Sequence, residues 1–168
     1  NPIEQEGTYP LPEAQMDRFM MKVSVGYPDF SSEKDILNSK VNIEGRLESI
    51  FSTDNIFQLQ KEVHDIYVDE KIKDLIVHLV HSTRPGNENF LREFKGAIIS
   101  GASPRATIWL NKIAKFKAFL EGKDFVSPDH IMAIAPAVLG HRIILSYEAS
   151  VDNIQSESII TRIAQNII

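Results

Sequence analysis

The sequence contains no cysteine among its 168 residues, which excludes disulfides, thiolate metal sites and thiol catalysis. This absence is compatible with a cytoplasmic location, which we expect for the protein. Long apolar runs are lacking as well. The longest nearly apolar stretch, Ile131 to Leu139, is nine residues long and includes Pro136. A membrane-spanning helix needs about 20 such residues, so we expect no membrane span.

The sequence has no excess of positive charge, because it contains 18 Lys and Arg but 23 Asp and Glu, which gives a net charge of −5. A net acidic chain is not an obvious binder of nucleic acid or of a membrane surface, and we expect neither partner. The 43% hydrophobic and 24% charged residues exclude collagen-like, low-complexity and wholly disordered classes. The length suits one domain or slightly more. Because the chain opens on Asn1, we expect it to be a piece of a longer protein.

The first 30 residues differ in composition from the rest. Half of the eight prolines fall here: Pro2, Pro10, Pro12 and Pro28. Residues 4–12 show no helical or strand period, which predicts a loop. Residues 21–25 alternate apolar and polar side chains, which predicts a strand that ends at Gly26. Since a single strand needs sheet partners, we expect this segment to be the tail of a sheet-containing domain.

From Ser31 onward the pattern is helical, with apolar side chains three and four residues apart and capping residues before most runs. We predict helices over residues 31–41, 53–66, 69–84, 103–122, 127–139 and 157–167. Residues 87–101 are predicted to form a loop, and residues 123–126 and 141–145 short extended pieces. The fold class is therefore mainly α, behind a strand and loop remnant.

The helix predicted after Ser103 has an apolar face and a basic one. We expect its buried face to carry Trp109, Ile113, Phe116 and Leu120. Six basic residues between positions 95 and 123, interleaved with aromatics, are compatible with nucleic-acid binding. Core packing explains the aromatics better, and the lysines are expected to form a solvated face. His78 and His81 also fall on a polar helix face, and none of the five histidines is assigned a role.

Two predicted helices begin with Ser-Pro, a favoured cap and first position. Asp129 follows one of these pairs and suits the positive end of the helix dipole, whereas Arg105 follows the other and does not. One interpretation is that free backbone N–H groups and the Arg105 guanidinium converge on an external anion such as phosphate. The alternative is a surface arginine in the first turn, and the pattern leaves both open.

Arg18 lies in a short segment that leads into the predicted strand. It is either the partner of Asp17 on a solvated turn or an arginine presented to a neighbour's phosphate. The sequence contains no GxxxxGK[ST] phosphate loop and no Ser/His/Asp nucleophile arrangement. The chain therefore carries no complete active site by itself.

Several segments resemble MoxR-type AAA+ ATPases. Residues 1–19, NPIEQEGTYPLPEAQMDRF, resemble the segment that follows the Walker B strand of that family. Thr83-Arg84, the segment Gly101 to Ala106 and the segment Val138 to Ile143 resemble landmarks of its lid domain, in the same order. Gly140 departs from the basic or bulky residue expected there, and residues 87–95 are less typical.

The resemblance implies roles for three residues. Asn1 matches the sensor-1 residue, which helps to orient the attacking water. Arg18 matches the arginine finger, which one subunit offers to the ATP bound by its neighbour. Arg105 matches the sensor-2 arginine, which reaches from the lid to the phosphates of its own subunit's ATP.

The resemblance also implies an organisation: residues 1–27 as the remnant of an α/β P-loop AAA+ core, and residues 28–168 as its helical lid. The whole protein is then expected to be a ring-forming ATPase, with six identical subunits, that remodels or matures partner proteins, including proteins with von Willebrand factor A domains. Walker A and Walker B segments, which hold most of the ATP and Mg²⁺, would lie upstream. This part alone is expected to be inactive.

Two alternatives of other classes remain: a helical nucleic-acid-binding module, with residues 103–122 as the recognition helix, and a protein-interaction scaffold without enzymatic role. The ATPase interpretation depends on where Arg105 points. An Arg105 held in an internal ion pair and directed away from the core remnant would argue against it.

Overall fold

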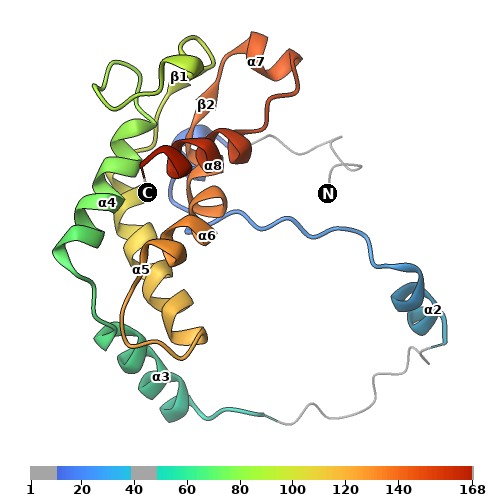
Figure 1. The fold of residues 1–168 in the computed structure, drawn as a ribbon. Coiled ribbons are helices and arrows are strands. Elements are labelled where there is room, and N and C mark those ends of the chain that lie inside the picture. Colours follow the sequence, from blue (N-terminus) through green and yellow to red (C-terminus); the bar gives the residue numbers. More distant parts are fainter. Residues whose placement is uncertain (1–10, 39–48, 168) are drawn as a thin grey trace.

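The computed structural model describes residues 11–38 and 49–167. Its central bundle consists of α4 (Glu70–Ser82), α5 (Pro104–Leu120), α6 (Pro128–Leu139) and α8 (Ser156–Ile167), with α3 (Thr53–Asp65) against α5 (Figure 1). Helix α6 is central, because it contacts α4, α5 and α8. The predicted mainly α fold class is confirmed.

Aliphatic side chains hold the bundle together. Ile131 and Leu139 of α6 and Ile160 of α8 have no exposed surface, and they belong to one core cluster with side chains from α4 and α5. Burying each such side chain contributes about 1.5–3 kcal/mol. The pattern of apolar residues in α6 and α8 therefore defines the centre of the domain.

The predicted helix starts are confirmed at several caps. The Asp69 carboxylate accepts a hydrogen bond of 2.9 Å from the Lys71 backbone N–H at the start of α4. Ser52 caps α3 with a reciprocal bond to Asn55. Helices α5 and α6 both begin at a proline that follows a serine. These local signals fix where the helices begin.

A small sheet lies at one end of the bundle. Strand β1 (Ile98–Ser100) pairs antiparallel with β2 (Ile144–Leu145), and Ile98 lies opposite Leu145. The prediction that residues 87–101 form only a loop is therefore wrong, since η1 (Arg92–Phe94) and β1 fall there. Residues 98–100 form a strand because they pair with β2 and because Ile98 is buried. Since β2 lies far from β1 in the sequence, local patterns do not indicate this pairing. Along the chain, the short 3-10 helix η2 (Gly140–Arg142) precedes β2, and helix α7 (Tyr147–Val151) follows it.

The buried face of α5 differs from the prediction. Its fully buried residues are mostly small: Ala106, Leu110, Ala114 and Ala118. Phe116 is 49% exposed and Leu120 is 65% exposed. The predicted apolar face is therefore correct at Ile113, which is buried, and in part at Trp109, which is half-buried against the core. Alanines allow α5 to approach its neighbours closely, which turns the larger side chains outward.

The N-terminal segment contains α1 (Glu13–Met16) and α2 (Phe30–Asn38), with no strand between them. The predicted strand at residues 21–25 is therefore wrong in this structure. Its edges find no sheet partner, and the Lys22 backbone N–H instead donates to the Ala137 carbonyl, at 2.9 Å. All residues of α2 are exposed, and Figure 1 shows this helix apart from the bundle.

Candidate functional site

The start of α5 is built on a close approach between two chain segments. The Ala102 backbone N–H donates to the buried Thr83 hydroxyl at 3.0 Å, and Arg84 Nε donates to the Ala102 carbonyl at 2.9 Å. A Cβ atom at Gly101 would lie 2.5 Å from the Thr83 carbonyl oxygen. The Thr83-Arg84 and Gly101-Ala102-Ser103 motifs are therefore two halves of one support for the α5 N-terminus.

Replacing Gly101 with alanine should test this support. The added methyl group meets backbone atoms that cannot move aside, so we expect Gly101→Ala to lower the free energy of unfolding by about 1–3 kcal/mol. Urea unfolding followed by circular dichroism measures the change. Gly26→Ala is the control, because a Cβ atom there has nothing within 4 Å. Equal stability of the two variants would contradict the close approach.

Arg105 lies in the first turn of α5, where no acidic residue is present. Its backbone N–H is capped by the Ser103 hydroxyl at 3.2 Å, and its side chain is 51% exposed. The Arg105 Nη1 atom lies 3.4 Å from Asp17 Oδ2. The lid arginine thus forms an internal ion pair, but with the segment that carries Arg18, so it faces the predicted core remnant rather than away from it.

Arg18 follows α1 directly. Its backbone N–H donates to the Gln15 carbonyl at 3.1 Å, which closes the turn after the helix. The residue is exposed, and its side chain forms no hydrogen bond or ion pair within residues 11–38 and 49–167. The predicted Asp17–Arg18 pair is not formed, because Asp17 points to other partners.

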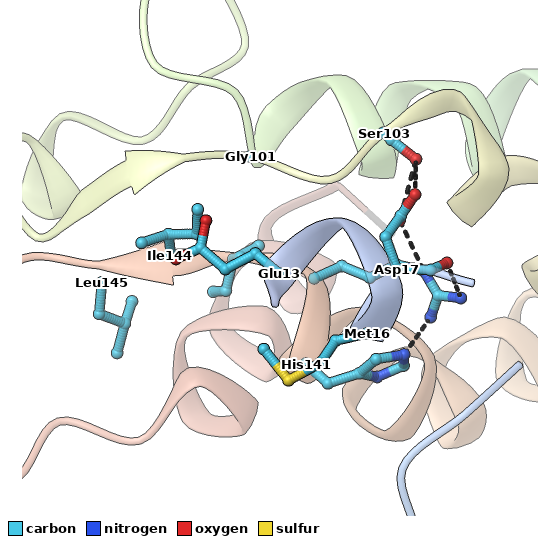
Figure 2. Close-up of a pocket in the computed structure, with 10 residues that line it drawn as sticks. Glu13, Met16, Asp17, Gly101, Ser103, His141, Ile144 and Leu145 are labelled. Atoms are coloured by element: carbon cyan, nitrogen blue, oxygen red, sulfur yellow. Dashed lines mark hydrogen bonds and ion pairs between the residues drawn. The ribbon is translucent and has the colours of Figure 1, made fainter. Parts of the chain in front are cut away.

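Asp17 joins the two segments, and the sequence did not predict this role. Its carboxylate accepts the Ser103 hydroxyl at 2.9 Å and 2.8 Å, as Figure 2 shows. It also lies 3.4 Å from Arg142 Nε as well as from Arg105. With its side chain only 19% exposed, Asp17 compensates two guanidinium charges at the junction between α1 and the bundle.

The second missed residue is Arg142, whose side chain is completely buried. It donates to the main-chain carbonyls of four residues: Asp17, Phe19, Met20 and Val138. The guanidinium therefore supplies hydrogen-bond donors to backbone carbonyls of both the turn after α1 and the end of α6. Burial lowers the pKa of Arg142, and Asp17 opposes this change. An arginine within an otherwise apolar stretch was the signal available in the sequence, because such a side chain needs a buried partner.

His141 completes the junction. Burial, together with the adjacent Arg142 charge, lowers the pKa of His141. The neutral ring can then accept a hydrogen bond from Arg142 at Nε2, with a separation of 2.8 Å. A cavity of about 400 Å³ lies beside it, lined by Glu13, Met16, Asp17, Ser103, His141 and Ile144 among others (Figure 2). The cavity separates α1 from β2 and the start of α5.

The structure brings Arg105 into contact with Asp17, the residue that precedes Arg18. Asn1 lies outside the described residues. No group of three or more His, Asp or Glu side chains that could hold a metal ion occurs in the described part of the chain. Within that same part, no helix is long and apolar enough to cross a bilayer.

Comparison with known proteins shows which family the chain belongs to. The sequence model of the AAA lid domain matches residues 94–163, and that of an ATPase family associated with various cellular activities matches residues 1–21. The chain is 36% identical to the chaperone MoxR1 of Mycobacterium tuberculosis over 167 residues, which is 99% of this chain and 44% of that protein. The chain belongs to the MoxR-type AAA+ family. The η2 segment and Ser103 therefore both lie within the residues that match the AAA lid domain.

Further similarities extend over nearly the whole MoxR-type chain. It is 41% identical to the uncharacterized protein YeaC of Bacillus subtilis over 97% of this chain and 49% of that protein. The crystal structure of an ATPase candidate from Cytophaga hutchinsonii superimposes with a TM-score of 0.90 and 41% identity. That match covers 98% of this chain and 51% of the solved one. The chain thus spans about half the length of these relatives.

Proposed function

We propose that this chain supplies the lid and the phosphate-sensing arginines of a MoxR-type ATPase. The observation that carries the proposal is the position of Arg105: half-exposed, in the first turn of α5, facing the segment with Arg18. A helix N-terminus with a guanidinium beside it favours the binding of a phosphate group. In a scaffold without nucleotide, Arg105 would serve only the long, half-exposed ion pair with Asp17, which contributes little stability.

Arg105 is proposed to contact the phosphates of ATP bound to its own subunit. The residues fit such a group, because the ion pair with Asp17 is long, at 3.4 Å, and half-exposed, so a phosphate can compete for the guanidinium. When bound, ATP supplies the phosphoryl group and Mg²⁺ offsets its charge. Most contacts to both, including the Walker A and Walker B residues, are proposed to come from segments upstream of this chain.

Arg18 is proposed to act on the ATP of a neighbouring subunit. The Arg18 side chain is exposed and forms no hydrogen bond or ion pair with residues 11–38 and 49–167, so it can reach outward from the fixed turn. Such an arrangement requires a head-to-tail ring, for which we propose six identical subunits. Asn1 is proposed to orient the attacking water. Rotation of the lid with the nucleotide state would drive remodelling of partner proteins, including ones with von Willebrand factor A domains, in the cytoplasm.

The proposal is tested with Arg105→Ala in the whole protein that contains this chain. Loss of a preorganised cation at the phosphates should lower ATP turnover by about 10²- to 10³-fold. Arg162→Ala is the control, because Arg162 is exposed on α8 and, among the residues that the structure describes, pairs only with Glu93. Normal hydrolysis by Arg105→Ala would contradict the proposal and favour the scaffold. Duplex DNA binding that weakens steeply with salt would favour the nucleic-acid module.

A further inference from the structure

One hydrogen-bonded link connects the two arginines of the proposed site within a single subunit. Asp17 immediately precedes Arg18, and Ser103 lies two residues before Arg105. Between them the Ser103 hydroxyl donates to Asp17 at 2.8 Å, although the two residues are 86 positions apart. The link therefore spans the junction between the α1 turn and the bundle (Figure 2).

The Ser103 hydroxyl has two tasks at once. Its oxygen accepts the Arg105 backbone N–H at 3.2 Å, and its single proton points to the Asp17 carboxylate. A hydroxyl has only one proton to donate, so its direction fixes the first turn of α5 relative to Asp17. Any rotation of this turn is thus transmitted to the residue next to Arg18.

The other side of Asp17 is held rigidly. The buried Arg142 binds the carbonyls of Asp17 and Phe19, on either side of Arg18, and its Nε lies 3.4 Å from the Asp17 carboxylate. The backbone of Arg18 is therefore clamped while its side chain remains exposed. Of the three polar partners of the carboxylate, Arg105 is the one with a half-exposed side chain that can leave.

We propose that Asp17 is a positioning residue that couples Arg105 to Arg18, so that the lid of one subunit sets the finger it offers to the next. This inference rests on the proposed function. In one state Arg105 pairs with Asp17; in the other it binds phosphate, and Asp17 keeps only Ser103 and Arg142. Asp17, which precedes Arg18, is thus next to the Arg105 charge in one state and not in the other. Coupling between two sites requires such a difference in contacts between the two states.

The test uses rings assembled from two kinds of whole-protein subunit. Acceptor subunits carry Arg18→Ala and keep their own phosphate contacts. Donor subunits keep both Arg18 and Arg105, and carry instead a substitution of the upstream Walker B acid that lets them bind ATP without hydrolysing it. Turnover in mixed rings then reports on how well the donor presents Arg18 to the acceptor. Because the acceptor is unchanged throughout, a defect confined to the donor's own nucleotide site does not affect this readout.

Adding Ser103→Ala to the donor should lower the restored turnover by about 10- to 100-fold, since small misplacement of a reacting group is costly. Ser103→Thr keeps the hydroxyl and should recover most of that loss. Ser127→Ala is the matched control, because Ser127 precedes Pro128 at the start of α6 as Ser103 precedes Pro104, but has no contact with Asp17. Donors with Ser127→Ala should restore turnover as well as the original donors.

Full restoration by donors with Ser103→Ala would overturn the inference and leave Ser103 as a cap only. If these donors do not fold or assemble, Asp17→Asn donors provide the second test, because a neutral amide lacks the charge that pairs with both guanidinium groups. They should restore less turnover, and full restoration would again overturn the inference. If even the original donors restore nothing, the proposed role of Arg18 fails instead, so the two failures are distinguishable.

Discussion

Replacing Arg18 with alanine should lower ATP turnover of the whole protein by about 10³- to 10⁵-fold, the range found for arginine fingers in other nucleotide hydrolases. ATP binding in the same variant should change little. The reason is geometric: Arg18 is exposed, and its side chain forms no hydrogen bond or ion pair in the described part of its own subunit. Its charge is then felt in the neighbour's site, mainly when the transferred phosphoryl group gains charge.

A role in catalysis is distinguished from a role in ATP binding by measuring both properties of the Arg18→Ala variant. Turnover is measured at saturating ATP, and binding is measured separately with a non-hydrolysable analogue. Arg162→Ala again serves as the control, because it removes an exposed arginine that is remote from the junction. Turnover of Arg18→Ala equal to that of the control would remove Arg18 from the proposed chemistry.

Replacing Arg142 with methionine should produce the largest loss of stability. Its guanidinium is completely buried, and its removal takes away the buried counter-charge of Asp17 and one donor from each of four carbonyls. Breaking such a pair costs about 3–5 kcal/mol, because one charge stays behind in a poorly solvated place. We expect a fall of this size in the free energy of unfolding, measured by urea denaturation.

A matched pair of variants separates the buried charge from general effects of the substitution. Arg162→Met makes the same change on an exposed surface and should alter stability by at most about 0.5 kcal/mol. Asp17→Asn combined with Arg142→Met should cost less than the sum of the two single changes, because the double variant leaves no buried charge unpaired. Strictly additive losses would contradict the ion pair as the source of the effect.

Helix positions were predictable because their signals are local. Ser52, Asp69 and Ser103 cap the helices expected after them, and the apolar spacing of α8 defines its buried side. The predicted strand at residues 21–25 was not found, because a strand depends on a partner and alternation of side chains does not supply one. The face of α5 was predicted from the helical spacing of its large apolar residues, whereas its fully buried side is formed mostly by alanines.

The candidate site shows the same division. Arg18 and Arg105 were singled out from the resemblance, and Arg105 also from its position at a helix start. Asp17 and Arg142 were not, because their contacts join residues 86 and 125 positions apart and leave no periodic trace. Only the folded chain shows that the segment with Arg18 is bound to the start of α5.

The central claim is that Arg105 acts within its own subunit and Arg18 on the next. Mixing equal amounts of Arg18→Ala and Arg105→Ala subunits tests it most directly. A head-to-tail ring then forms composite sites with both arginines at about a quarter of its interfaces. Turnover should therefore rise well above that of either variant alone, to at most about a quarter of normal. If both arginines serve the same subunit, no intact site forms, and a mixture as inactive as its components would contradict the account.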